Sequence, residues 1–162
     1  GGWGVARAAA ACGDGPGVGA GLPHRGAGDP TALAPPHAEV VGGDTLAHCD
    51  IRDDNILIRD DGTALLCDWN WPVAGAPWLD SLFLLIGPRG DGLDVEAHIA
   101  DHPLLGVVPA EHVDIALAVV LGYFAHSANQ PVPATSPHVR AVQAWQRTVI
   151  EQWIAERRGW DE

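Results

Sequence analysis

The first 30 residues limit where a hydrophobic core can form. Glycine, alanine and proline dominate this stretch, and its few apolar side chains keep no helical or alternating period beyond one turn. Such a segment cannot bury enough apolar surface to offset the conformational entropy lost on ordering. We therefore expect residues 1–44 to be flexible, with at most one short helix near residues 5–12, and residues 45–162 to form the folded domain.

The composition is that of an ordinary globular protein, and the charge indicates which kinds of partner the chain is not suited to bind. Apolar residues make up 47% and charged residues 19% of the 162 residues, so the chain is neither a highly charged disordered segment nor a fibrous repeat. Asp and Glu number 21 against 9 basic residues, all arginine, for a formal net charge of -12. This acidity argues against binding to nucleic acid or to an anionic membrane, and leans slightly towards a cationic partner.

The expected compartment is the cytoplasm. No apolar run approaches the roughly 18 residues that a membrane span needs, and the first residues lack the pattern of a signal peptide. The three cysteines, Cys12, Cys49 and Cys67, are too few and too scattered for a disulfide framework, which favours a reducing environment.

Short strands followed by helices are expected after residue 44. Three apolar segments are typical of strands: 45–48, 55–59 and 64–67. The last two are joined by a turn that contains Asp61-Gly62, a strong hairpin signal. Four later segments have helical apolar spacing or helix-start signals: about 79–86, 93–101, 109–126 and 137–158. The predicted fold class is therefore α+β, a small strand cluster followed by a helical bundle.

Two details of this pattern predict burial. Gly87-Pro88-Arg89-Gly90 is expected to end the first helix. The last helix is expected to turn five apolar side chains inward: Val139, Val142, Trp145, Val149 and Trp153. Cys49 and Cys67 flank strands predicted to be buried and are most simply small core residues.

Residues with carboxylate or amide side chains lie before and after the predicted hairpin. Asp50 follows the first strand in a loop, Asn55 comes five positions later, and Asp68 follows the return strand of the hairpin. Because a tight hairpin brings the outer ends of its two strands together, Asn55 and Asp68 should lie side by side. Carboxylate and amide oxygens suit Mg²⁺, which usually takes one or two carboxylates plus substrate phosphates.

The spacing of these residues resembles that of a known family. His48-x-Asp50-x-x-x-x-Asn55 is similar to the catalytic loop of aminoglycoside phosphotransferases and of the wider protein-kinase-like superfamily. Cys67-Asp68-Trp69 resembles the family's later Asp-Trp or Asp-Phe, and Pro77-Trp78-Leu79-Asp80 the segment in which an Asp opens a helix of the large lobe. The resemblance covers about residues 45–85 and continues more loosely to the C-terminus. It implies a kinase-like large (C-terminal) lobe, mostly helical, with a small β-hairpin carrying the catalytic loop.

The resemblance implies a role for each matched residue. Asp50 would be the catalytic base that orients the attacking hydroxyl and accepts its proton. Asn55 and Asp68 would hold Mg²⁺ against the β- and γ-phosphates of ATP. His48 and Asp80 would be structural residues at the site.

Arg52 and the neighbouring acidic residues are more open to interpretation. Arg52 lies two residues past the expected base, and we predict that it stabilises the charge of the transition state. Taken alone, Asp50 would be interpreted as a turn cap and Asp68 as the partner of an arginine, but their joint register with His48 and Asn55 favours catalysis. Further acidic residues fit a solvated rim, or a surface for a cationic acceptor: Asp53, Asp54, Asp60 and Asp61.

The nucleotide-gripping half of a kinase-like enzyme is not expected in this chain. The small lobe normally supplies a glycine-rich hairpin and a lysine, but the chain has no lysine, and the glycines between 13 and 21 are not flanked by alternating apolar strands. Residues 1–44 could hold only a remnant of the hinge region. The expectation is thus a partial enzyme, an ATP-dependent phosphotransferase that acts on a hydroxyl of a small molecule. The alternative is a non-catalytic remnant that folds but does not transfer phosphate.

Overall fold

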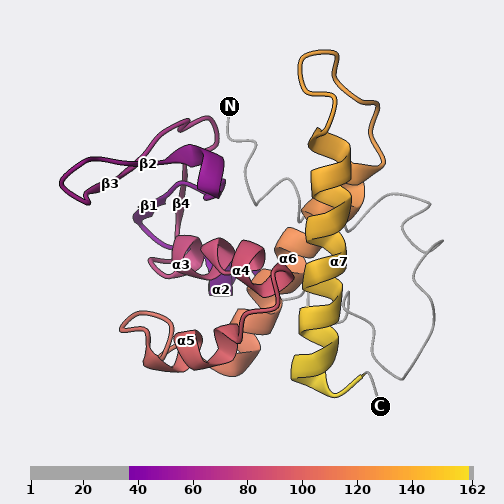
Figure 1. Cartoon of the computed structure of the whole chain (residues 1–162). Helices are drawn as coiled ribbons and strands as arrows, with labels where there is room; N and C mark the ends of the chain where they lie inside the picture. Colours follow the sequence, from indigo (N-terminus) through magenta and orange to yellow (C-terminus); the bar gives the residue numbers. More distant parts are fainter. Residues whose placement is uncertain (1–36, 161–162) are drawn as a thin grey trace.

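The computed structural model describes residues 37–160, where two small antiparallel sheets lie beside a group of helices (Figure 1). The elements follow in this order: α2 (His37–Val41), β1 (Thr45–Ala47), the 3-10 helix η2 (Asp53–Asn55), β2 (Ile56–Ile58), β3 (Ala64–Leu66), β4 (Val73–Gly75), α3 (Leu79–Leu84), α4 (Ile86–Gly90), α5 (Val95–Asp101), α6 (Ala110–Ala128) and α7 (Val139–Arg158). The predicted α+β class is confirmed. The helix expected near residues 5–12 lies outside the described residues.

Part of the segment that the sequence predicted to be flexible is structured. The short helix α2 buries Val40 and Val41, and the Val41 carbonyl accepts a hydrogen bond from the Ala76 backbone nitrogen at 2.9 Å. Residues 37–44 therefore belong to the folded domain rather than to a flexible segment. Five residues are too few to show a helical period, which is why the pattern did not reveal this helix.

The two sheets are nested along the chain. β2 and β3 form the predicted hairpin, in which Ile56 pairs with Leu66 and Ile58 with Ala64. The sequence did not predict β4, which pairs with β1 so that Leu46 lies opposite Ala74. The hairpin is thus inserted between the two strands of the other sheet. The loop after β1 and the loop before β4 are therefore brought to the same place.

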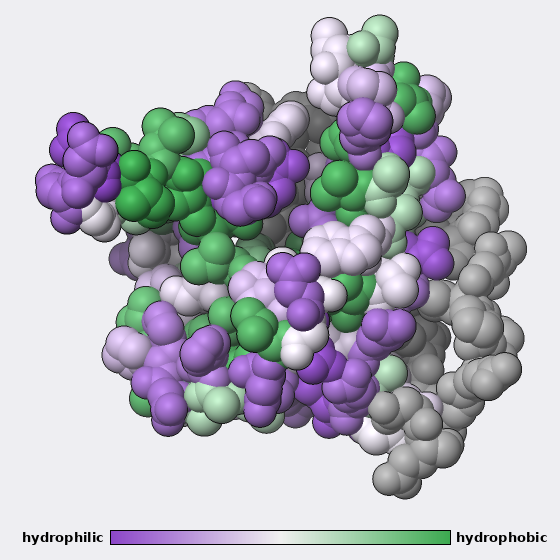
Figure 2. Space-filling view, viewed as in Figure 1, coloured by the Kyte–Doolittle hydropathy of each residue, from purple (hydrophilic) through white to green (hydrophobic). Residues whose placement is uncertain are grey.

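The hairpin is much more exposed than expected. Leu57 and Ile58 are more than half exposed, and Leu65 and Leu66 on the facing strand are also exposed (Figure 2). Within the described part of the chain, each of these strands has one neighbour and the hairpin projects from the helices (Figure 1). The expectation of buried strands on both sides of the loops was wrong, because apolar composition alone does not show what covers a strand.

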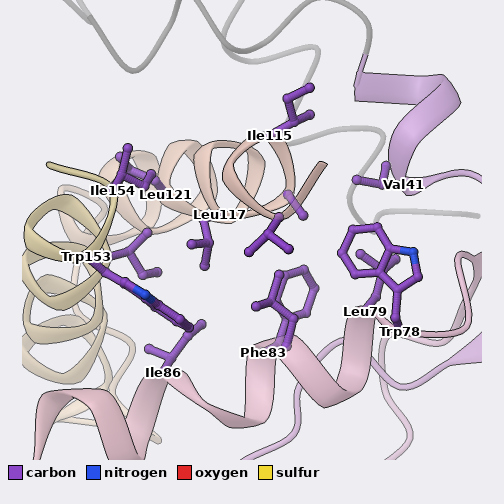
Figure 3. Close-up of a cluster of buried hydrophobic side chains, with 14 of the residues drawn as sticks. Val41, Trp78, Leu79, Phe83, Ile86, Ile115, Leu117, Leu121, Trp153 and Ile154 are labelled. Carbon is purple, nitrogen blue, oxygen red and sulfur yellow. The ribbon is translucent and has the colours of Figure 1, made fainter. Parts of the chain in front are cut away.

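The core is formed by side chains from each of the helices α2 to α7. Phe83 and Ile86 point from α3 and α4 towards Leu117 on α6 and Trp153 on α7 (Figure 3). α6 and α7 pack along one another (Figure 1). The Trp153 side chain is buried, and its indole nitrogen donates a hydrogen bond to Glu96 Oε1 at 2.7 Å.

Helix boundaries differ from the prediction at two places. Gly87-Pro88-Arg89-Gly90 does not end the helix; the chain turns at Leu85 and continues as α4. Pro88 lies in the first turn of α4, where a backbone N–H has no partner within the helix, so its ring is tolerated. The last helix begins at Val139, two residues after the predicted start at Pro137.

The buried face of α7 also differs from the prediction. Val142 and Trp145 are 40% and 44% exposed, whereas Ile150 and Ile154 are fully buried. Val142 faces a pocket instead of the core, and Trp145 covers Gly90, where an added Cβ would lie 2.2 Å from the indole ring. Within residues 37–160, no helix combines the length and apolar character needed to cross a membrane.

A matched pair of leucines on α3 tests this core. We expect Leu82→Ala to lower the free energy of unfolding by about 2–5 kcal/mol, because Leu82 is completely buried and its removal leaves a cavity. Leu84→Ala, two residues further on and 41% exposed, should cost about 1 kcal/mol or less. Urea unfolding of both variants measures the difference, and equal losses would contradict the packing described.

Candidate functional site

The loop after β1 is held by one carboxylate. Asp80, in the first turn of α3, accepts hydrogen bonds from the backbone nitrogens of His48 and Cys49, at 2.7 and 2.9 Å. Cys49 has a φ of 60°, the left-handed conformation that residues other than glycine seldom adopt. Both carboxylate oxygens of Asp80 therefore stabilise the sharp bend that leads the chain to Asp50.

His48 connects this loop to the end of the hairpin. Its side chain is fully buried, and Nδ1 accepts a hydrogen bond from the Asp50 backbone nitrogen at 3.2 Å. On the other side of the ring, Nε2 lies 2.9 Å from the Cys67 carbonyl oxygen, which requires the proton to be on Nε2. The Trp69 ring packs edge-on against His48, with centroids 4.6 Å apart. The His48 imidazole therefore lies between Asp50 and the segment that carries Asp68, and it links the two by hydrogen bonds.

Asn55 joins the same two segments by a separate route. Its side-chain nitrogen donates to the Asp50 carbonyl oxygen at 2.8 Å and lies 3.4 Å from Asp50 Oδ2. The backbone carbonyl oxygen of Asn55 accepts a hydrogen bond from the Cys67 backbone nitrogen at 3.0 Å, so Asn55 lies opposite the residue before Asp68. Because Asp50 takes the amide nitrogen, the amide oxygen of Asn55 remains as a ligand atom.

The Asp50 carboxyl group is half-buried and surrounded by charge. Burial raises the pKa of Asp50 above its ordinary value, and the nearby positive charge of Arg52 offsets part of this effect. The Arg52 Nε atom lies 3.4 Å from Asp50 Oδ1 and 3.1 Å from Asp54 Oδ1. Neither contact has the alignment of a hydrogen bond, so Arg52 acts on both carboxylates mainly through its charge.

Asp68, like Cys49, has a left-handed backbone conformation. Its φ is 61°, and its carbonyl oxygen accepts a hydrogen bond from the Asn70 backbone nitrogen at 2.8 Å, while the Asn70 side chain donates to Asp68 Oδ1. Among the described residues, no arginine forms an ion pair with Asp68, so the interpretation of this residue as a simple salt-bridge partner has no support there.

Asp50 and Asp68 lie at one side of a pocket of about 530 Å³. Arg52, Asn70 and Trp71 line the same side, and the opposite wall comes from α6 and α7. This volume is within the range of roughly 300–1,000 Å³ that is typical of small-molecule sites. Sequence reasoning missed the α7 wall. The positions 139, 142, 143 and 146 lie on one helical face, and the apolar ones among them were assigned to the core.

Asn55 and Asp68 carry oxygen atoms of the kind that a hard metal ion prefers. Within residues 37–160, no group of three or more His, Cys, Asp or Glu side chains could hold a metal ion alone. Asn55 and Asp68 instead offer an amide oxygen and a carboxylate on adjoining segments. Two such ligands suit Mg²⁺, which keeps several waters and commonly binds substrate phosphates.

The two described cysteines do not form a nucleophilic site. Burial raises the pKa of the Cys49 thiol to about 12, with further contributions from the carboxylates of Asp80 and Asp50. A thiol with this pKa is protonated at neutral pH and is a poor nucleophile. The Cys67 thiol donates to the Asn55 carbonyl oxygen at 3.3 Å, which is a structural contact.

Comparisons with known proteins do not extend this description. No protein-family model matches the chain, and no curated protein or solved structure matches it. The function must therefore be argued from the residues and their geometry.

Paired variants test the role of Asp80. We expect Asp80→Asn to lower the free energy of unfolding by about 1–3 kcal/mol, because an amide offers one acceptor oxygen where two backbone donors need one each. The control is Asp94→Asn, since Asp94 accepts a single bond from the Glu96 nitrogen at a helix N-cap, where Asn serves equally well. Equal losses in urea unfolding would show that Asp80 does not hold the loop.

Proposed function

We propose that this chain is the large lobe of an ATP-dependent small-molecule phosphotransferase, similar to the aminoglycoside phosphotransferases. The observation that carries the proposal is that the loop with Asp50 and Asn55 adjoins the segment before Asp68, the two being joined by hydrogen bonds of His48 and Asn55, while Asp80 holds the bend before Asp50. Asp50 and Asn55 have the spacing of the catalytic loop that the sequence resembles, and Asp68 has the place of the family's later Asp-Trp. Asp50 and Asp68 open onto a pocket large enough for a small molecule.

In the proposed reaction, Asp50 orients the acceptor hydroxyl and takes its proton. A bond forms between the hydroxyl oxygen and the γ-phosphorus of ATP, and the bond to the β-γ bridging oxygen breaks so that ADP leaves with that electron pair. Little covalent chemistry is required from the protein, and catalysis depends on positioning and electrostatics. The raised pKa of Asp50 favours its role as a proton acceptor, since a more basic carboxylate binds the proton more strongly.

The remaining residues would act on the phosphates. Asn55 and Asp68 would hold Mg²⁺, which when bound neutralises charge on the β- and γ-phosphates. Arg52 lines the pocket beside Asp50, a position from which its guanidinium can stabilise negative charge on the transferred group.

The proposal includes a second, nucleotide-gripping half. The lysine and glycine-rich hairpin of the family's small lobe do not occur in residues 37–160, and the chain contains no lysine. The exposed apolar side chains of the β2–β3 hairpin, including Leu57 and Ile58, offer a surface for such a half to cover. The second candidate function is a kinase-like remnant that folds but does not transfer phosphate.

Replacement of the proposed base distinguishes the two candidates. In the full-length protein with Mg²⁺ and ATP, Asp50→Asn should reduce kcat by about 10²-fold or more, because the amide cannot accept the proton. Asp101→Asn, a matched change at the exposed end of α5 and outside the pocket, should leave kcat unchanged. ADP release measures turnover, and an unaltered urea midpoint shows that the fold persists. Wild-type turnover in Asp50→Asn, or no turnover in the unaltered protein, would overturn the proposal.

The pH dependence tests the charges around Asp50. Activity needs the Asp50 carboxylate, so kcat/KM should fall as the pH drops through its pKa, which lies above the ordinary value. Arg52 lowers and Asp54 raises this pKa. Arg52→Ala should therefore move the acid limb to higher pH and also reduce kcat, whereas Asp54→Asn should move the limb to lower pH. Shifts in the same direction would contradict this electrostatic arrangement.

A further inference from the structure

We infer that the acceptor is a hydroxyl compound with a largely apolar body and not a polycation. This inference rests on the proposed function and concerns the pocket beyond Asp50. The negative net charge of the whole chain would favour a cationic acceptor. A bound acceptor, however, contacts the residues that line the pocket, and these determine its chemistry.

The α6 side of the pocket wall opposite the proposed base is apolar, and the α7 side is mixed. α6 contributes Val119, Val120, Tyr123 and Phe124, whereas α7 contributes Val139 and Val142 together with the polar Arg140, Gln143 and Gln146. Aliphatic and aromatic side chains in this wall gain free energy by removing apolar ligand surface from water. An acceptor covered with ammonium groups would lose hydration here without gaining partners.

The charges of the pocket do not favour a polycation either. Two carboxylates, Asp50 and Asp68, are balanced by two guanidinium groups, Arg52 and Arg140. The proposed reaction already uses both carboxylates, one as the base and one at Mg²⁺. Arg140 has no carboxylate partner among the described residues, so the charge left for the acceptor's body is positive and would repel ammonium groups.

Gln143 supplies a polar contact on the α7 side of this wall. Its side chain is largely buried, and its Oε1 accepts a hydrogen bond from Arg140 Nη1 at 2.8 Å. This bond fixes the orientation of the amide and leaves the Gln143 side-chain nitrogen as a donor without a partner among the described residues. A hydroxyl or carbonyl oxygen on an otherwise apolar acceptor would accept a hydrogen bond from this donor, which would orient the acceptor in the pocket.

The test measures binding, so that it does not depend on phosphate transfer. The full-length protein is titrated calorimetrically with neutral steroid diols and with kanamycin, an aminoglycoside that carries several ammonium groups. We expect the best neutral diol to bind at least about tenfold more tightly than kanamycin. Val142→Glu should weaken binding of that diol by about tenfold, because it replaces an apolar side chain of the wall by a charged one.

A matched substitution outside the pocket provides the control. Val107 is 82% exposed and does not line the pocket, so Val107→Glu adds the same charge without altering either affinity. Val142 is itself partly exposed, so unchanged urea midpoints are expected for both variants. Tighter binding of kanamycin, binding of no neutral diol below millimolar concentration, or equal effects of the two variants would overturn the inference.

Transfer of phosphate separates this inference from the proposed function. The same compounds are incubated with the protein, Mg²⁺ and ATP, and the phosphorylated product is identified by mass. A diol that binds with the expected dependence on Val142 but is never phosphorylated would refute the proposed function and leave the pocket assignment intact. Phosphorylation of kanamycin in preference to every diol would support the proposed function and refute this inference.

Discussion

Two hydrogen bonds from the backbone of His48 and Cys49 to the Asp80 carboxylate determine the position of the candidate site. The bend that they stabilise has a φ of 60° at Cys49, which would be unfavourable without such support. Asp80 belongs to α3, whose Leu79 and Leu82 are buried in the helical core. The loop that carries Asp50 is therefore anchored to the buried helical core, although the strands on either side of the site are only three residues long.

The nested order of the strands gives the site its second half. Since the β2–β3 hairpin is inserted between β1 and β4, the chain must leave and re-enter the β1–β4 sheet at one end. His48 lies between the segment that leaves β1 and the segment that returns to β4, and it binds both, through the Asp50 backbone nitrogen and the Cys67 carbonyl oxygen. Each of these segments carries one carboxylate, Asp50 or Asp68, that lines the same pocket. Asp50 and Asp68 are therefore far apart along the chain because the whole β2–β3 hairpin lies between them.

The sequence allowed local features to be predicted, but not what surrounds them. Asp61-Gly62 specifies its turn by backbone chemistry alone, so the hairpin was predicted correctly, as was the closeness of Asn55 to the Asp68 segment. The outward position of Trp145 was not predicted, because apolar spacing cannot distinguish a core from the wall of a pocket or the cover of a small residue such as Gly90. Likewise, α2 and β4 are too short for a period and depend on tertiary contacts.

The exposed hairpin has a consequence for how copies of this protein behave in solution. Each described strand lies in a two-stranded sheet, so every one has an open edge, and apolar side chains project from the hairpin beside those edges. Open apolar edges invite intermolecular strand pairing. Their three-residue length limits the template, and the net charge of -12 makes copies repel each other. The acidity of the chain thus provides colloidal protection, a role that needs no acidic residue near the pocket.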